Sequence, residues 1–120
     1  MDDLLVEKVL RAAECIPAGR VANYGMLAEL VGTPARLVGR VMSTWGANVP
    51  WWRVTNSAGR LPAALTERAL SEWAAEGTPL NTARDGVALS RARADAVALA
   101  AAWEEACADL HDDAELPSES

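Results

Sequence analysis

Two adjacent tryptophans, Trp51 and Trp52, are the most distinctive chemical feature of this 120-residue sequence. They stand in the run Pro50-Trp51-Trp52-Arg53-Val54, which we expect to be extended. Successive side chains of an extended segment point to opposite sides, so one indole can enter the core while the other lines a surface or cleft. An accessible indole offers a flat face and one N–H donor, which suits stacking on an unstacked nucleobase. For either tryptophan taken singly, packing in the core is the alternative.

The sequence offers few residues for catalysis. Its only histidine, His111, stands in the acidic C-terminal stretch, so a Ser/His/Asp or Cys/His arrangement cannot be assembled around a buried base. Cys15 and Cys107 fall on predicted helices beside apolar neighbours, which predicts buried structural thiols and neither a disulfide framework nor a zinc site. No glycine-rich phosphate loop is present. These absences favour a binding protein, without a cofactor or a metal, over an enzyme.

Positive charge is concentrated in one stretch of an otherwise acidic chain. The net charge is −6, yet residues 20–62 hold five arginines against the single acid Glu29. Such a basic stretch predicts a local anion-binding face, although an ordinary solvated surface has the same pattern.

The apolar periodicity predicts a mainly helical domain over residues 1–110 that contains a helix-turn-helix. Asn23 can cap the second helix and Gly32 can stop it. Thr33-Pro34 can start the third helix, with the proline at its first position. We expect helices over 3–15, 24–31, 34–44, 64–75 and 94–110, a short strand over 85–90, and an acidic, disordered tail over 111–120.

The third predicted helix has one face on which two arginines lie one turn apart. Arg36, Gly39, Arg40 and Ser43 fall within an arc of about 100°, opposite the apolar side chains. A glycine inside a helix costs ~1 kcal/mol relative to alanine, which close approach of the helix to a phosphate backbone can offset. The alternative is a weak helix with solvated arginines.

Five short motifs follow one another over about residues 3–90. They are Ile16-Pro17-Ala18-Gly19-Arg20-Val21, Tyr24-Gly25-x-Leu27-Ala28, Ala35-Arg36-x-Val38-Gly39, Pro50-x-x-Arg53-Val54 and Gly59-Arg60-Leu61. Together they resemble the DNA-binding domain of the O6-alkylguanine-DNA alkyltransferases. In that family the active-site motif is Pro-Cys-His-Arg-Val, and its cysteine takes the alkyl group. Here Trp51 stands at the cysteine position and Trp52 at the histidine position, which is similar to the alkyltransferase-like proteins that lack the nucleophile.

The resemblance implies a winged-helix-like helix-turn-helix domain with a short β-hairpin or wing and an extra C-terminal helix. It implies that Arg36 enters the duplex through the minor groove and fills the gap left by a flipped base. Tyr24 would crowd the 3′ phosphate and drive the nucleotide to rotate, while Gly39, Arg40 and Ser43 would face the strands.

The resemblance also implies a lesion pocket, in which Trp51 is the residue expected to border the base. Glu76 falls where the enzymes keep a glutamate that supports their histidine, and Trp52 leaves it no imidazole to polarise. The residues expected around the pocket are Tyr24, Trp51, Trp52, Arg53, Val54 and Ser57.

The function expected from this resemblance is binding of O6-alkylguanine in double-stranded DNA by base flipping, without alkyl transfer. The complex would flag the lesion for nucleotide-excision repair proteins. We expect a monomer without a membrane partner. We expect it in the cytoplasm, because the N-terminus is acidic, unlike a secretory signal, and on the nucleoid when it is bound to DNA. Two alternatives stay open: a sequence-specific helix-turn-helix transcriptional regulator, and an active alkyltransferase that uses Cys15 or Cys107 as an atypical acceptor.

Overall fold

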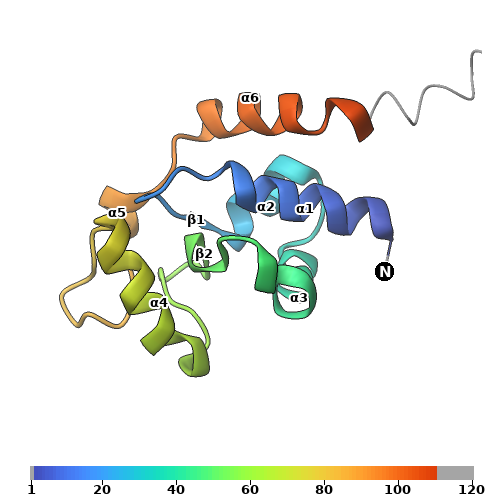
Figure 1. Ribbon diagram of the computed structural model, residues 1–120. Helices are drawn as coiled ribbons and strands as arrows, with labels where there is room; N and C mark the ends of the chain where they lie inside the picture. Colours follow the sequence, from blue (N-terminus) through green and yellow to red (C-terminus); the bar gives the residue numbers. More distant parts are fainter. Residues whose placement is uncertain (1, 111–120) are drawn as a thin grey trace, which may run out of the picture.

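The protein is mainly helical, as the sequence predicts (Figure 1). The computed structural model describes residues 2–110, so the predicted tail over 111–120 and His111 lie outside the described part. None of the helices in this part is long and apolar enough to cross a membrane. In order, with η for a 3₁₀ helix, the elements are α1 (Asp3–Cys15), β1 (Ala22–Asn23), α2 (Tyr24–Val31), α3 (Ala35–Trp45), η1 (Gly46–Asn48), η2 (Trp51–Arg53), β2 (Val54–Thr55), α4 (Ala63–Glu76), α5 (Leu89–Ala92) and α6 (Ala96–Ala106).

Helices α2 and α3 form the predicted helix-turn-helix. The side chain of Asn23 accepts a backbone N–H of the first turn of α2 at 2.8 Å, as expected of a cap. Gly32 ends α2 with a φ of 85°, which favours glycine. The predicted start of α3 is wrong in detail, because Pro34 is the N-cap and no side chain caps the helix. Thr33 instead completes the end of α2 by donating its N–H to the Ala28 carbonyl.

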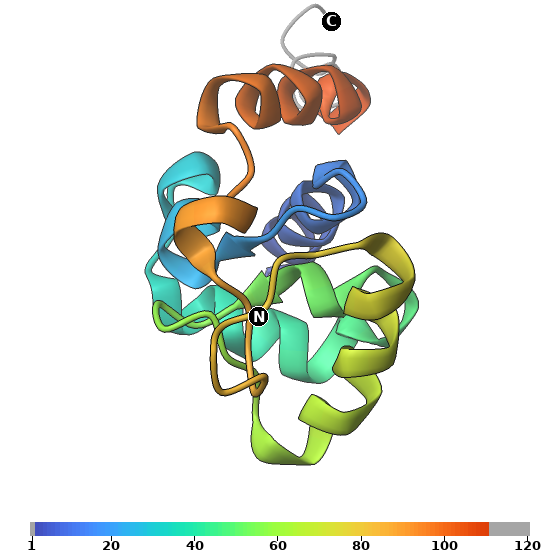
Figure 2. The same ribbon diagram turned by 90° about the vertical axis from the view of Figure 1, so that its left-hand side faces the viewer.

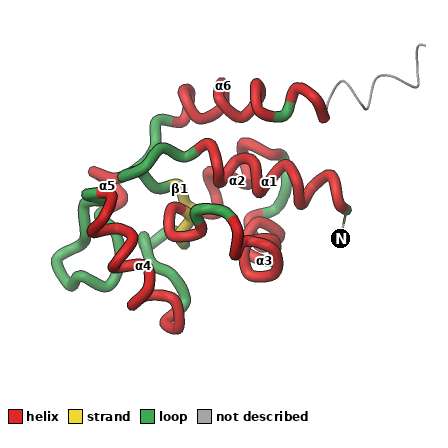
Figure 3. The backbone as a smooth tube through the Cα atoms, in the orientation of Figure 1, coloured by secondary structure: helices red, strands yellow, loops and turns green. Residues whose placement is uncertain are grey.

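The strands differ from the expected hairpin (Figure 3). β1 and β2 pair in parallel, with Ala22 opposite Val54, and the helix-turn-helix forms the crossover between them. The segment predicted as a strand over 85–90 contributes one antiparallel bridge, between Leu80 and Val87, before the chain enters α5. In place of the expected wing, the chain forms a turn over residues 80–87 that is closed by this single bridge.

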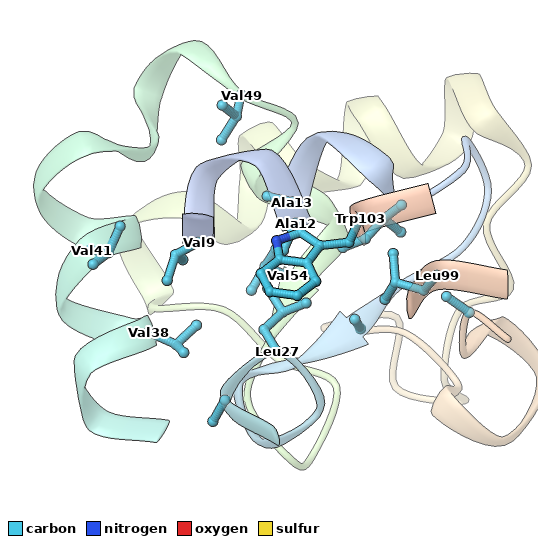
Figure 4. Close-up of a cluster of buried hydrophobic side chains, with 14 of the residues drawn as sticks. Val9, Ala12, Ala13, Leu27, Val38, Val41, Val49, Val54, Leu99 and Trp103 are labelled. Atoms are coloured by element: carbon cyan, nitrogen blue, oxygen red, sulfur yellow. The ribbon is translucent and has the colours of Figure 1, made fainter. Parts of the chain in front are cut away.

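The main core gathers around α1, which lies between α3 and α6 (Figures 1 and 2). Val9 of α1 is fully buried and meets Leu27 of α2 and Val38 of α3 (Figure 4). Trp103 of α6 closes this core from the other side, and its indole Nε1 donates to the carbonyl of Lys8 at 2.9 Å. The predicted core position of Trp103 is confirmed.

A smaller core joins α4 to the rest of the fold. Trp73 is fully buried there, as predicted, and packs with Val21 and Val87. The two adjacent tryptophans, Trp51 and Trp52, pack against the edge of this cluster. The second core therefore fixes η2 between the helix-turn-helix and α4.

Candidate nucleic-acid interface

The outer face of α3 brings the predicted DNA-contact residues together. Arg36 and Arg40 are exposed, whereas Val38 and Val41 on the opposite side are fully buried. Neither arginine makes an ion pair with any residue between 2 and 110. Ser43 is also exposed, and its hydroxyl donates to the carbonyl of Arg40 at 3.0 Å. The face can therefore offer two uncompensated guanidinium groups to phosphates.

The space around Gly39 does not require a glycine. A Cβ added at Gly39 would lie 3.9 Å from the ring of Tyr24, an ordinary van der Waals distance. Packing among residues 2–110 therefore does not require a glycine here, although a helical glycine costs ~1 kcal/mol relative to alanine. The missing side chain also leaves room for another molecule to approach the α3 backbone closely.

A cleft between α3, η2 and α4 adjoins this face, and we call it the α3–α4 cleft. The inner part has a volume of about 60 Å³, and the outer part has a volume of about 350 Å³. Both parts are lined by Met42, Ser43, Trp51, Pro62 and Leu65, so they form one continuous hollow. Tyr24, Gly39, Val54 and Leu61 complete the inner part, and Gly46, Ala47 and Arg68 complete the outer part.

The prediction that Trp51 and Trp52 point to opposite sides of an extended segment is wrong. They lie on the 3₁₀ turn η2, where the Arg53 N–H donates to the Pro50 carbonyl at 3.0 Å. Their ring centroids are 5.5 Å apart and the ring planes meet at 87°, an edge-to-face pair. Trp51 lines both parts of the cleft, and Trp52 lines neither. Trp51 is therefore the indole that is placed to meet a ligand.

Arg53 also lies away from the cleft, contrary to its predicted place in the pocket. Its guanidinium Nε lies 3.1 and 3.2 Å from the two carboxylate oxygens of Glu76, Nη2 adds a third bond, and Nη1 donates to the Ile16 carbonyl at 2.9 Å. The two side chains are only 16% and 12% exposed. Arg53 therefore connects η2 to α4 and to the end of α1.

The environment of Glu76 favours its charged form. Burial of the Glu76 carboxyl works against ionisation, but the hydrogen bonds from Arg53 and from the Gly19 N–H outweigh it and lower the pKa of Glu76. Glu76 therefore binds the guanidinium of Arg53, whereas the corresponding glutamate of the enzymes is expected to support a histidine.

The remaining predicted pocket residues divide between cleft and surface. Tyr24, the first residue of α2, lines the inner part, where burial raises the pKa of its phenol. Val54 is buried at the base of the same part. Ser57 is exposed on the turn after β2 and does not line the cleft. The cleft lining thus includes Tyr24, Trp51 and Val54, but not Trp52, Arg53 or Ser57.

Sequence reasoning missed Arg68. This exposed residue of α4 lines the outer part of the cleft, and its guanidinium carbon lies 5.2 Å from the centroid of the Trp51 ring. Such a distance is typical of a cation–π contact. No local spacing could have indicated the pair, because the fold alone brings α4 over η2.

The two cysteines lie outside the α3–α4 cleft. Cys107 is fully buried, as predicted, but Cys15 is only half-buried. Burial raises the pKa of both the Cys15 and the Cys107 thiol, which disfavours the nucleophilic thiolate. Within residues 2–110, no group of three or more histidine, cysteine, aspartate or glutamate side chains is placed to hold a metal ion.

Comparisons with known proteins agree with this geometry. Residues 5–77 match the family described as 6-O-methylguanine DNA methyltransferase, DNA binding domain. A DNA base-flipping protein from Vibrio parahaemolyticus is 38% identical over 65 residues, which cover 51% of this chain and 64% of that protein. Alkyltransferase-like protein 1 from Schizosaccharomyces pombe is 43% identical over 63 residues, which cover 49% of this chain and 58% of that protein. These matches span less than two thirds of the curated relatives' length.

A solved structure extends the likeness to most of the fold. The crystal structure of S. pombe Atl1 in complex with damaged DNA containing O6-carboxymethylguanine superimposes with a TM-score of 0.67. It is 31% identical in sequence, and the match covers 79% of this chain and 98% of that chain. The expected mainly helical fold, with an alkyltransferase-type helix-turn-helix, is confirmed. The chain belongs to the family of 6-O-methylguanine DNA methyltransferase DNA-binding domains.

Proposed function

We propose that this protein binds O6-alkylguanine in duplex DNA, holds the base outside the helix, and transfers no alkyl group. The observation that carries the proposal is Trp51 in the α3–α4 cleft, because the family's alkyl-accepting cysteine corresponds to this position. An indole can stack on a purine but cannot accept an alkyl group as a thiolate does.

Docking begins with α3. Arg40 neutralises a phosphate, while Gly39 lets the helix lie close to the strands. Arg36 then enters the minor groove and fills the space that the extruded base leaves, and Tyr24 crowds the neighbouring phosphate. Extrusion costs a few kcal/mol of unstacking and unpairing, and this cost is lower for a poorly paired alkylguanine.

The α3–α4 cleft receives the flipped base. Stacking on an aromatic ring contributes ~1–3 kcal/mol per base, and Trp51 supplies the ring. The inner part, at about 60 Å³, is far smaller than an ordinary ligand site, while the outer part, at about 350 Å³, is within the usual range. The flipped base therefore lies mainly in the outer part of the cleft, beside Trp51.

The bound lesion persists because no thiol lines the cleft. Since the alkyl group stays on the base, a different activity has to remove it. We therefore propose that nucleotide-excision repair proteins are the partners that read the distorted complex.

The test is fluorescence anisotropy with two duplexes of identical sequence, one holding O6-methylguanine and one guanine. We expect tighter binding of the methylated duplex and, by mass spectrometry after incubation, no added methyl group on the protein. Equal affinity for the two duplexes would contradict the proposal. A preference among undamaged sequences would indicate a transcriptional regulator, and a methyl group on Cys15 or Cys107 would indicate an alkyltransferase.

A further inference from the structure

A second hollow, of about 860 Å³, lies between α6 and the connection from α1 to β1. We call it the α6 groove. Its floor consists of small apolar side chains, among them Ala18, Ala98 and Ala102, with Leu99 as the largest. Alanines leave this space open because they are too short to fill it. The groove shares no lining residue with the α3–α4 cleft.

Positive charge lies at one end of the α6 groove. Arg20 and Arg93 both line it and are both exposed. Parallel pairing of Val21 with Arg93 brings the segments that carry the two arginines together, and Arg20 Nη1 donates to the Arg91 carbonyl at 2.9 Å. Neither Arg20 nor Arg93 forms an ion pair within the described chain.

Within residues 2–110, Asp95 is the one acidic residue that lines the groove. The carboxylate of Asp95 accepts the backbone N–H of Ala98 at 2.9 Å and so caps the start of α6. The positive end of the α6 dipole points to the same place. Even with the charge of Asp95 counted, the two arginines leave a net charge of +1 in the groove lining, in a protein whose net charge is −6.

The α6 groove lies on the opposite side of α1 from the DNA-contact face. Figures 1 and 2 show α1 between α3 and α6, and the groove opens between α6 and the segment that follows α1. A molecule in the groove can therefore bind while α3 is on DNA.

We propose that the α6 groove binds an acidic, amphipathic peptide segment of a partner protein. Carboxylates of the peptide pair with Arg20 and Arg93, and its apolar side chains cover the alanine floor. A DNA backbone would gain only the charge interaction and would leave the apolar floor exposed. The combination of two arginines with an apolar floor therefore favours a peptide. This inference rests on the proposed function, since a protein that holds a lesion without repairing it needs a partner.

The test uses a labelled peptide of glutamate and leucine, with a peptide of lysine and leucine as its charge control. We expect binding of the first peptide only, weakened about tenfold or more by the double variant Arg20→Glu/Arg93→Glu. Ala98→Leu, which fills the groove without changing charge, should weaken binding as well. Arg20→Glu and Arg93→Glu are also tested singly, and Arg84→Glu is the control of equal charge change for each single variant, because Arg84 is exposed and lies outside the groove lining.

Cys15 provides a second readout, because it lines the groove and is half-buried whereas Cys107 is buried. The bound peptide should protect Cys15 from a thiol reagent. Equal peptide binding by the double variant and the parent protein would overturn the proposal. If undamaged duplex displaced the peptide, and if the double variant bound that duplex more weakly than the parent protein does, the groove would be a second DNA contact. This result would also overturn the proposal. Affinity for the O6-methylguanine duplex, measured on the same variants, tests the proposed function separately and should stay unchanged.

Discussion

The guanidinium of Arg53 and the carboxylate of Glu76 form a largely buried ion pair that holds the tryptophan turn η2 against α4. The backbone of the turn is held as well, because the Trp73 Nε1 donates to the Trp52 carbonyl at 2.7 Å. Trp51, one residue earlier, projects into the α3–α4 cleft. The orientation of the cleft-facing indole of Trp51 therefore depends on an ion pair that itself lies outside the cleft.

Glu76→Gln should reduce the free energy of unfolding by ~2–3 kcal/mol at neutral pH, because it removes charged hydrogen bonds from a buried guanidinium. The pKa of Glu76 is lowered in the folded protein, so its stabilisation is fully present above the ordinary glutamate pKa of about 4.3. The contribution is lost as the pH falls through the lower, folded value. Urea unfolding of both proteins across this range should show a difference that shrinks on acidification. A difference that is independent of pH would contradict the assignment.

Gly39→Ala should change stability and DNA binding in opposite directions. The added Cβ meets only the Tyr24 ring at 3.9 Å, so the free energy of unfolding, measured by thermal unfolding, should rise by up to ~1 kcal/mol. Affinity for both damaged and undamaged duplexes should fall, because the methyl group holds α3 off the strands. Gly32→Ala is the control. Because Gly32 has a φ of 85°, alanine there should lower the free energy of unfolding by ~1–2 kcal/mol, and the substitution leaves the α3 face unchanged. Unchanged DNA affinity in Gly39→Ala would show that no close approach occurs there.

Arg36→Ala and Arg40→Gln should weaken DNA binding in different ways. Both side chains are exposed, so the fold should stay intact in each variant. Arg40→Gln removes a phosphate contact, which should weaken all duplexes alike and reduce the salt slope by about 1. Arg36→Ala should weaken binding of O6-methylguanine duplex well over tenfold and reduce the preference for it, because the wedge is lost. Anisotropy titrations over a salt series separate the two effects, and identical losses on both duplexes for Arg36→Ala would remove its assigned role.

The shared exposed face of Arg36, Arg40 and Ser43 on α3 could be predicted from the sequence, but the conformation of the tryptophan turn η2 could not. The caps at Asn23 and Gly32 are local, since each satisfies backbone groups of the adjacent helix turn, and both were predictable. The conformation of η2 depends instead on Glu76, which is distant in sequence and reaches Arg53 only in the folded chain. The parallel pairing of β1 with β2 is equally non-local.

Trp51→Cys places a thiol at the position of the family's nucleophile, and we expect no alkyl transfer to it. Glu76 is engaged by Arg53, and no histidine lies within residues 2–110, so a thiol at position 51 would have no base to make it a thiolate. Loss of the indole should also weaken binding of the methylated duplex by ~1–3 kcal/mol. Mass spectrometry after incubation with O6-methylguanine duplex should show no methyl adduct, whereas Trp51→Phe should retain most of the affinity. Methyl transfer to the new cysteine at neutral pH would mean that the ion pair between Arg53 and Glu76 does not prevent activation.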